Sequence, residues 1–152
     1  MQTRKRFWLE EGLTGAATTD LSLMTAYDKN FYQPGTRGIL EAYVAGARAR
    51  NLAAMSADDR FNVVANEMPL IHPEIRQHLE GGSSICWDDE QWSRGAYAWF
   101  RPGEMTTMRP HIATPEGRIH FAGDHTSASP GWMNGALQSG DRVAREVAAL
   151  AS

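Results

Sequence analysis

The residues at the carboxyl end of the chain place the strongest constraint on its fold. A short alternating segment, Arg118–Ala122, is followed by Gly123, by the acidic Asp124 and by a loop of small and polar residues. From about Gly131 to Leu150, apolar residues recur at steps of three and four, which predicts a closing amphipathic helix. A strand, a loop and a helix in this order indicate an α/β or α+β protein.

A strand–loop–helix unit of this kind suits the binding of a nucleotide cofactor. The free N–H groups at the start of the helix carry partial positive charge and can bind an electron-rich carbonyl or phosphate. Gly123 and Gly131 allow the backbone to approach a ligand closely, and Asp124 can accept hydrogen bonds from sugar hydroxyls. The spacing alone is not specific, because any α/β unit contains such a turn.

The rest of the chain contains signals for short helices and strands. Ser56 precedes Asp59 by three residues, which is a capping pattern and predicts a helix start near Ser56. Pro69 is expected to end or kink that helix. Further elements are expected as strands over Gly38–Gly46 and Ser83–Trp87 and as a short helix over His72–Leu79.

The composition excludes several classes of protein and of site. With 152 residues, 42% of them apolar and 22% charged, the chain can form a hydrophobic core. A net charge of −3 without a basic block argues against a nucleic-acid partner. No apolar run reaches the roughly 18 to 20 residues that a membrane-spanning helix needs. The single cysteine, Cys86, excludes an intrachain disulfide, and the five histidines show no metal-ligand spacing.

Three blocks of sequence point to a known family. Phe121–Thr126 with Gly131–Gly140 resembles the C-terminal signature of the flavin-containing amine oxidases, which include monoamine, polyamine and L-amino-acid oxidases. Trp87–Tyr97 with Arg101–Gly103 resembles an upstream segment of the same family. A block near the amino end resembles the L-amino-acid oxidase branch in particular. It comprises Lys5–Trp8, Glu10–Gly12 and Thr18–Leu21.

The resemblance implies roles for individual residues. Tyr97 and Trp132 match the two positions of an aromatic cage in front of the flavin, where aromatic faces exclude water and orient an amine. Tyr27 lies near a tyrosine that binds the substrate carboxylate, although the local register does not match. Without the resemblance, such aromatic residues would be interpreted as packing residues. The residues matched to FAD contacts are Trp87, Gly123, Asp124, Gly131, Trp132, Met133 and Ala136.

The chain departs from the family pattern in three respects. Ala96 stands where the monoamine oxidases have the cysteine that bonds to FAD, so the resemblance implies non-covalent FAD. Arg94 stands where relatives often have the first of two glycines. The dinucleotide fingerprint G-x-G-x-x-G is absent from the sequence. We therefore expect a partial amine oxidase fold, with the end of the substrate domain followed by the last strand and helix of the FAD-binding domain.

The domain and function predictions follow from that interpretation. Residues 1–86 are assigned to the substrate-binding domain, and residues 87–152 to a segment that returns to the FAD-binding domain. The expected function is the C-terminal part of an FAD-dependent L-amino acid oxidase, with no catalytic acid, base or metal ligand assigned. Such a part needs an upstream FAD-binding portion or subunit, and its substrate would be a small amine or amino acid. The sequence leaves open whether the chain forms a homo-oligomer. The alternatives are a monoamine or polyamine oxidase fragment and a cofactor-free binding module. A soluble, cytoplasmic chain is expected if Met1 is the true start.

Overall fold

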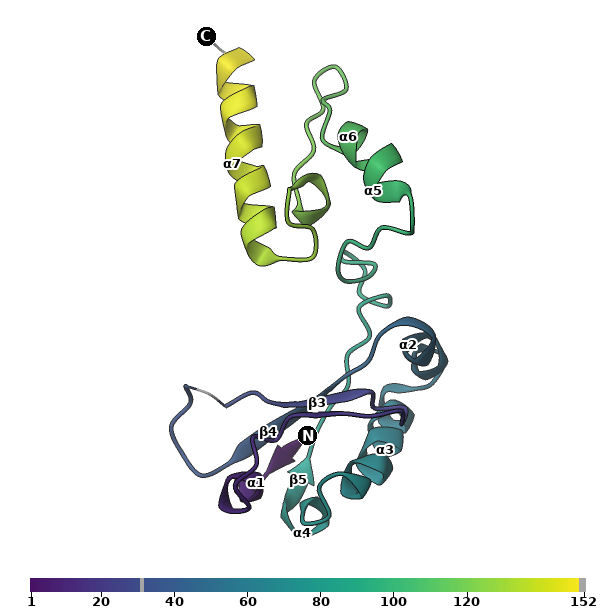
Figure 1. Ribbon diagram of the computed structural model, residues 1–152, viewed down its shortest axis with the longest axis vertical. Helices are drawn as coiled ribbons and strands as arrows, with labels where there is room; N and C mark the ends of the chain where they lie inside the picture. Colours follow the sequence, from purple (N-terminus) through teal and green to yellow (C-terminus); the bar gives the residue numbers. More distant parts are fainter. Residues whose placement is uncertain (31, 151–152) are drawn as a thin grey trace. The chain divides into compact units, whose positions relative to one another are not determined.

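The computed structural model describes residues 1–30 and 32–150 (Figure 1). They form two compact units, an N-terminal unit of Met1–Cys86 and a C-terminal unit that begins at Trp87. The mixture of helices with one sheet gives the α/β character that the sequence predicts. No helix in the described ranges is long and apolar enough to cross a membrane.

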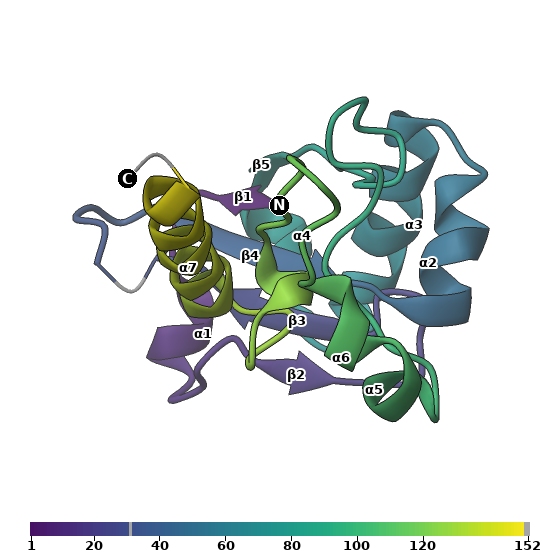
Figure 2. The same ribbon diagram turned by 90° about the horizontal axis from the view of Figure 1, so that it is seen from above.

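The N-terminal unit is built on an antiparallel sheet with the strand order β2-β3-β4-β1-β5. In Figure 2, β2, β3 and β4 run side by side. The helices α1, α3 and α4 lie on one side of this sheet in Figure 1. The strands are β1 (Gln2–Thr3), β2 (Ala17–Thr18), β3 (Thr25–Asp28), β4 (Gly38–Tyr43) and β5 (Leu79–Gly81). The helices are α1 (Phe7–Glu10), α2 (Gly46–Ala53), α3 (Ala57–Glu67), the 3-10 helix η1 (Met68–Leu70) and α4 (Ile75–His78).

The core of this unit is centred on Trp8, which is fully buried. Its indole Nε1 donates a 3.0 Å hydrogen bond to the Oδ2 atom of Asp28, a buried carboxylate at the end of β3. Because successive side chains of a strand face opposite sides, Leu40 on β4 is buried while its neighbour Ile39 is exposed. The other buried apolar residues of the cluster are Phe7, Leu23, Ala26, Met68 and Ile75.

The helix signals of the N-terminal unit are confirmed. Helix α3 begins after Ser56, whose Oγ accepts a hydrogen bond from the Asp59 backbone N–H at 3.1 Å. The helix ends at Glu67, and Pro69 lies in the 3-10 turn that follows. The short helix expected over His72–Leu79 is present as α4.

The strand predictions are confirmed only in part. The strand expected over Gly38–Gly46 is β4, which ends at Tyr43. The strand expected over Ser83–Trp87 is wrong, because the structure places β5 earlier, at Leu79–Gly81. The reason is that the neighbouring strand, β1, is short. Strand β5 pairs with β1, which has only two residues, so the segment after Gly81 has no strand beside it in the described part of the chain.

The C-terminal unit contains helices and turns. Its elements are α5 (Glu104–Thr107), α6 (Arg109–Ile112), the 3-10 helix η2 (Asp124–Thr126) and α7 (Met133–Leu150). The closing helix predicted from the apolar spacing is thus confirmed. The strand predicted over Arg118–Ala122 is wrong, since only an isolated bridge between Glu116 and Ile119 forms there. No strand of the described C-terminal unit is available to pair with this segment, and a single extended segment cannot satisfy its own backbone groups.

Candidate functional site

The residues expected to contact a cofactor meet at a turn that is organised by Asp124. The Oδ2 atom of Asp124 accepts hydrogen bonds from the backbone N–H of Gly131 at 2.8 Å and of Ala98 at 3.1 Å. One carboxylate oxygen therefore joins the segment after Tyr97 to the turn that precedes Trp132. A carboxylate that accepts backbone N–H groups is a strong, charge-assisted acceptor, so this link fixes the turn.

The ring of Tyr97 lies directly against the backbone of Gly131. A Cβ added to Gly131 would lie 2.8 Å from Cδ2 of Tyr97, and the φ angle of Gly131 is +80°. Only glycine meets both conditions without strain. The structure thus places the Tyr97 ring against Gly131, the residue before Trp132. The cage role of Tyr97 and Trp132 stays a prediction.

The start of α7 is packed against the same turn. Gly135 and Ser139 are buried on one side of the helix. The Ser139 hydroxyl donates to the Ala136 carbonyl at 2.6 Å and accepts from the Gly123 backbone N–H at 2.8 Å. A Cβ on Gly135 would lie 2.2 Å from the Ser129 carbonyl oxygen, so helix and turn are in direct contact.

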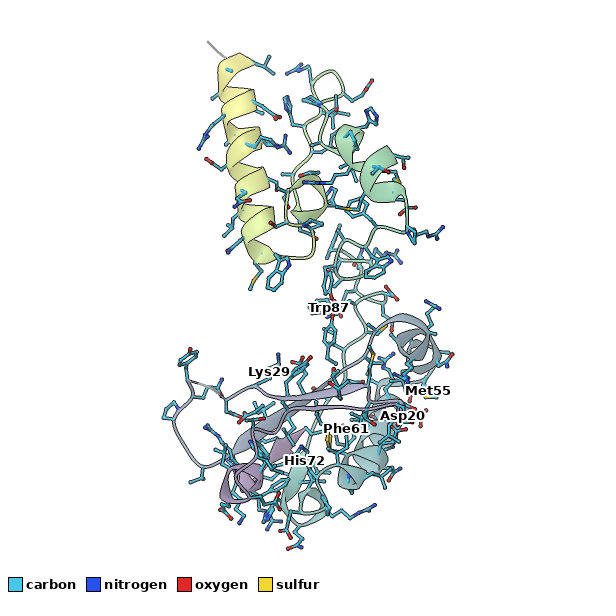
Figure 3. All side chains as sticks on the ribbon, viewed as in Figure 1. Asp20, Lys29, Met55, Phe61, His72 and Trp87 are labelled. Carbon is cyan, nitrogen blue, oxygen red and sulfur yellow. The ribbon has the colours of Figure 1, made fainter. Side chains whose placement is uncertain are left out.

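Large apolar side chains at this turn are exposed rather than packed. Trp132 is 71% exposed and Met133 is 85% exposed, and both lie at the start of an 18-residue helix. Tyr97 and Trp87 are about half exposed, and Trp87 lies at the beginning of the C-terminal unit (Figure 3). The first N–H groups of a helix have no intrahelical acceptor. The turn therefore offers aromatic faces and backbone donors to a ligand with a flat, electron-rich edge.

A second set of polar contacts holds the segment before the turn against α7, and the sequence analysis did not identify it. Arg142 donates to the Phe121 carbonyl at 2.7 Å, and His120 Nδ1 lies 3.1 Å from Glu146 Oε2. The hydrogen bond with His120, followed by that from Arg142, lowers the pKa of Glu146. Arg142 and Glu146 are four residues apart on α7, a spacing that favours an ion pair, but no sequence signal indicates the partner His120.

Comparison with known proteins decides the family. Residues 1–148 match the family described as "Flavin containing amine oxidoreductase". The chain belongs to this family. The protein YobN of Bacillus subtilis (strain 168) is 33% identical over 151 residues, which cover 97% of this chain and 32% of YobN. The L-amino-acid oxidase BmooLAAO-I of Bothrops moojeni is 30% identical over 151 residues, covering 94% of this chain and 30% of that protein.

A solved structure shares the fold of this amine oxidoreductase chain. Putrescine oxidase bound to putrescine superimposes with a TM-score of 0.83 at 28% sequence identity. The match covers 97% of this chain and 33% of the putrescine oxidase chain. The chain spans about a third of the length of the curated relatives and of the solved structure that it matches. The predicted family and the predicted partial amine oxidase fold are thus confirmed.

Membership of the family implies a flavin cofactor, and the residues at the turn fit such a group. A flavin has a flat ring with carbonyl oxygens at one edge, which matches the exposed Trp132 and the backbone donors at Met133. Asp124 cannot use its Oδ2 atom for a sugar hydroxyl, because that atom already holds Gly131 and Ala98. Asp124 therefore positions the turn through Oδ2, and its predicted contact with the cofactor would involve the other carboxylate oxygen, Oδ1.

The other predicted site residues lie at defined places. Ala136 is partly buried on α7, and its N–H donates to the Trp132 carbonyl at 3.2 Å. Tyr27 lies in the N-terminal unit, on the exposed face of β3, with the Lys29 ammonium 5.4 Å from its ring centre. No cluster of possible metal ligands occurs among residues 1–30 and 32–150. The binding roles of these residues stay predictions.

Arg94 adopts a conformation that suits glycine. Its φ angle is +53°, in the left-handed region, and it is followed by Gly95 with φ of +137°. The resemblance places a glycine at position 94 in many relatives, and the backbone here keeps the glycine-like shape although the residue is arginine. A non-glycine residue in this region costs on the order of 1 kcal/mol.

We predict that the turn is loosened at acidic pH through Asp124. Burial raises the pKa of Asp124, but the hydrogen bonds from Gly131 and Ala98 outweigh it, so the pKa is below its ordinary value. A lowered pKa in the folded state means that the stabilisation is present above the ordinary pKa of aspartate and is lost as the pH falls through the folded pKa. The amide signals of Gly131 and Ala98, followed by NMR during acid titration, should shift together at that pH.

The matched control for this titration is Asp124→Asn. The amide oxygen of asparagine still accepts a hydrogen bond but does not titrate in this range. The common shift of the Gly131 and Ala98 signals should then disappear. A common shift that persisted in Asp124→Asn would assign the titration to another group.

Proposed function

We propose that this chain is the C-terminal part of an FAD-dependent L-amino acid oxidase and that it binds FAD without a covalent bond. The observation that carries the proposal is that Asp124 joins the backbone of Ala98 and Gly131, the neighbours of the exposed Tyr97 and Trp132, before the start of α7. L-amino-acid oxidases about 30% identical to this chain support the substrate class. Ala96 supports non-covalent binding, because alanine offers no side-chain atom that could bond to a flavin.

The chain's own residues would bind and orient rather than donate or remove protons. The backbone donors at Met133 would hold the pyrimidine edge of the cofactor, and Gly131 would let Tyr97 approach closely. Tyr97 and Trp132 would exclude water and align the substrate amine. When bound, a flavin supplies the oxidising power, by accepting a hydride from the substrate and passing the electrons to oxygen. The products of the complete enzyme would be a 2-oxo acid, ammonia and hydrogen peroxide.

The proposal includes a partner that supplies the upstream FAD-binding portion. The chain spans about a third of its relatives, and its sequence has no G-x-G-x-x-G fingerprint for the pyrophosphate. Among residues 1–30 and 32–150, the sheet is antiparallel throughout, whereas that fingerprint belongs to a parallel βαβ unit. This portion would be part of the same polypeptide or a separate chain.

The experiment that tests the function is an absorbance spectrum together with a peroxide assay. The chain is purified alone and together with the upstream polypeptide, FAD is added, and free cofactor is removed. We expect the absorption bands of oxidised flavin with the upstream polypeptide, release of the flavin into the supernatant on acid precipitation, and peroxide from L-amino acids but not their D-enantiomers. Flavin retained in the precipitate would contradict the non-covalent mode, and absence of flavin under every condition would overturn the proposal.

An amine oxidase without carboxylate recognition is the second candidate. The fold match to putrescine oxidase bound to putrescine favours it. The same assay separates the two, since peroxide from putrescine but not from L-amino acids would assign the chain to the amine branch. The amino acid branch is preferred because the relatives named L-amino-acid oxidases match at 29 to 33% identity over nearly the whole chain.

A further inference from the structure

The segment that contains Gly123 and Asp124 is held against α7 by an arginine of that helix. The Nη2 group of Arg142 donates to the Phe121 carbonyl at 2.7 Å and to the Thr126 hydroxyl at 3.3 Å. Phe121 lies two residues before Gly123, and Thr126 lies two residues after Asp124. One guanidinium group therefore bonds to the segment on both sides of these two residues.

The guanidinium group of Arg142 is itself held in a fixed orientation. Its Nη1 group donates to Oε1 of Glu146, one turn further along α7, and Oε2 of Glu146 lies 3.1 Å from Nδ1 of His120. The three side chains are 10% to 32% exposed, so water competes less for these bonds than at a fully exposed ion pair. The planar guanidinium, bonded through both terminal nitrogens, has little freedom to rotate. Glu146 and His120 thus orient Arg142 toward the segment.

The 3-10 helix η2 is closed by bonds that do not involve the arginine. The Thr126 N–H donates to the Gly123 carbonyl at 3.0 Å, and the Ser127 N–H donates to the Asp124 carbonyl at 3.1 Å. The Gly123 N–H also donates to the Ser139 hydroxyl of α7 at 2.8 Å. Without Arg142, η2 would keep its own bonds and its link to Ser139. The arginine therefore decides where η2 lies on α7 more than whether η2 forms.

The place of η2 in turn decides where the Asp124 carboxylate lies. Its Oδ2 atom accepts from the Gly131 N–H at 2.8 Å and from the Ala98 N–H at 3.1 Å. These two donors belong to separate segments of the chain, so a shift of η2 changes both bonds together. The shift would then reach Trp132 and Tyr97, the residues next to the two donors.

We propose that Arg142 is a positioning residue for the turn that is expected to contact the cofactor. It fixes η2 on α7, and through Asp124 it sets the place of the backbone of Gly131 and Ala98. The consequence for a flavin rests on the proposed function, whereas the effect on the turn is a property of this chain alone.

The first test measures hydrogen exchange of the Gly131 and Ala98 amides in the chain without flavin. The variant Arg142→Gln removes the guanidinium, and both amides should exchange about tenfold faster, because Asp124 no longer meets them in good geometry. Amides in the middle of α7 should exchange as before. An unchanged rate at the two amides would overturn the proposal. An equal acceleration throughout α7 would overturn it too, since that would show a general loss of stability.

The matched control is Arg145→Gln on the same helix. Arg145 pairs with Asp141 at the same spacing of four residues, but its side chain is 79% exposed. We expect no change at the turn in this variant. If Arg142→Gln does not fold, Arg142→Lys takes its place. Lysine keeps the charge but has one nitrogen in place of the fork, so faster exchange is again expected. Exchange as in the unaltered chain would then overturn the role of the fork.

A double variant tests whether the bond to Thr126 carries the effect. Thr126→Val removes the hydroxyl that accepts from Arg142, and it also removes the bond from that hydroxyl to the Gly123 carbonyl. Combined with Arg142→Gln, it should accelerate exchange at the turn by less than the product of the two single effects, because both substitutions remove the same bond. Independent effects would overturn the proposed path through Thr126.

The cofactor readout is the dissociation constant of flavin in the assembled oxidase. It should rise about tenfold in Arg142→Gln and stay unchanged in Arg145→Gln. Faster exchange at the turn with no flavin under any condition would retain the positioning role of Arg142 in the chain and overturn the oxidase. An oxidase that holds flavin with an unchanged dissociation constant in Arg142→Gln would retain the oxidase and overturn the positioning of the cofactor.

Discussion

The variant Gly135→Ala is expected to destabilise the C-terminal unit and to displace the turn that carries Trp132. The added Cβ would lie 2.2 Å from the Ser129 carbonyl oxygen and 2.3 Å from the Ser127 hydroxyl. The atom of Ser129 that would clash belongs to the backbone, so the turn has to move away from the helix. Overpacking of this kind costs about 1–3 kcal/mol or more. Thermal unfolding followed by circular dichroism should show the loss, and the assembled oxidase should retain less flavin.

Gly140→Ala is the matched control for this prediction. Gly140 lies in the same helix, α7, and a Cβ there would meet no atom within 4 Å. Alanine favours the interior of a helix over glycine by about 0.5–1 kcal/mol, so this variant should be slightly more stable than the unaltered chain. The two substitutions change the stability in opposite directions only if Gly135 packs against the turn. Equal effects of the two variants would contradict that packing.

The features that the sequence predicted correctly are those whose cause lies within a few residues. The hydroxyl of Ser56 and the backbone of Asp59 are three positions apart, and their hydrogen bond caps the start of α3. The apolar repeat after Gly131 is likewise a local property of α7. In both cases the residues that interact are also neighbours in the sequence, so the pattern is visible without knowledge of the fold.

The strand errors have the opposite cause. Arg118–Ala122 alternates as a strand does, and Ser83–Trp87 has suitable residue types, but neither segment has a strand to pair with in the described part of the chain. A strand forms only when a neighbour satisfies its backbone groups. Residue type predicts that a segment can pair, and the availability of a partner decides whether it does.

Only part of the organisation of the candidate site could be predicted from the sequence. Asp124 and Gly131 were identified as cofactor residues, and the structure shows a bond between them that fixes the turn. The bond from Ala98 to Asp124 spans 26 residues, and nothing in the spacing indicated it. This link joins the segment after Tyr97 to the turn before Trp132. The placement of Tyr97 against Gly131 therefore depends on a long-range contact of the fold.

The block Lys5–Trp8, which resembles the L-amino-acid oxidases, contains residues of the hydrophobic core. It favoured the L-amino-acid oxidase branch in the sequence, yet Phe7 is 1% exposed and Trp8 is fully buried. Gly38 on β4 fits against the indole, because a Cβ there would lie 2.3 Å from the Trp8 Cη2 atom. The block thus marks the core of the N-terminal unit.

The variant Trp8→Ala is expected to unfold the N-terminal unit. Removal of a buried tryptophan side chain costs about 3–5 kcal/mol. The substitution also leaves the buried carboxylate of Asp28 without its indole donor, which adds about 1–3 kcal/mol. The sum is comparable with the whole stability of a small domain, which is about 5–15 kcal/mol. Circular dichroism should show loss of sheet signal, and denaturant titration should show no folded baseline.

Two further variants distinguish three effects on stability. These are the packing of the Trp8 ring, the hydrogen bond from Trp8 to Asp28, and a change at the protein surface. Trp8→Phe keeps an aromatic ring but removes the Nε1 donor to Asp28, so a smaller loss of stability is expected. Leu9→Ala alters the next residue, which is 53% exposed, and should change the free energy of unfolding by about 0.5 kcal/mol or less. A folded Trp8→Phe chain of unchanged stability that altered substrate preference in the assembled oxidase would show a direct role of Trp8 in specificity. Loss of stability without a change in preference would show that the block acts through the core, because the indole is buried against Asp28 and Gly38 and has no exposed surface to present to a substrate.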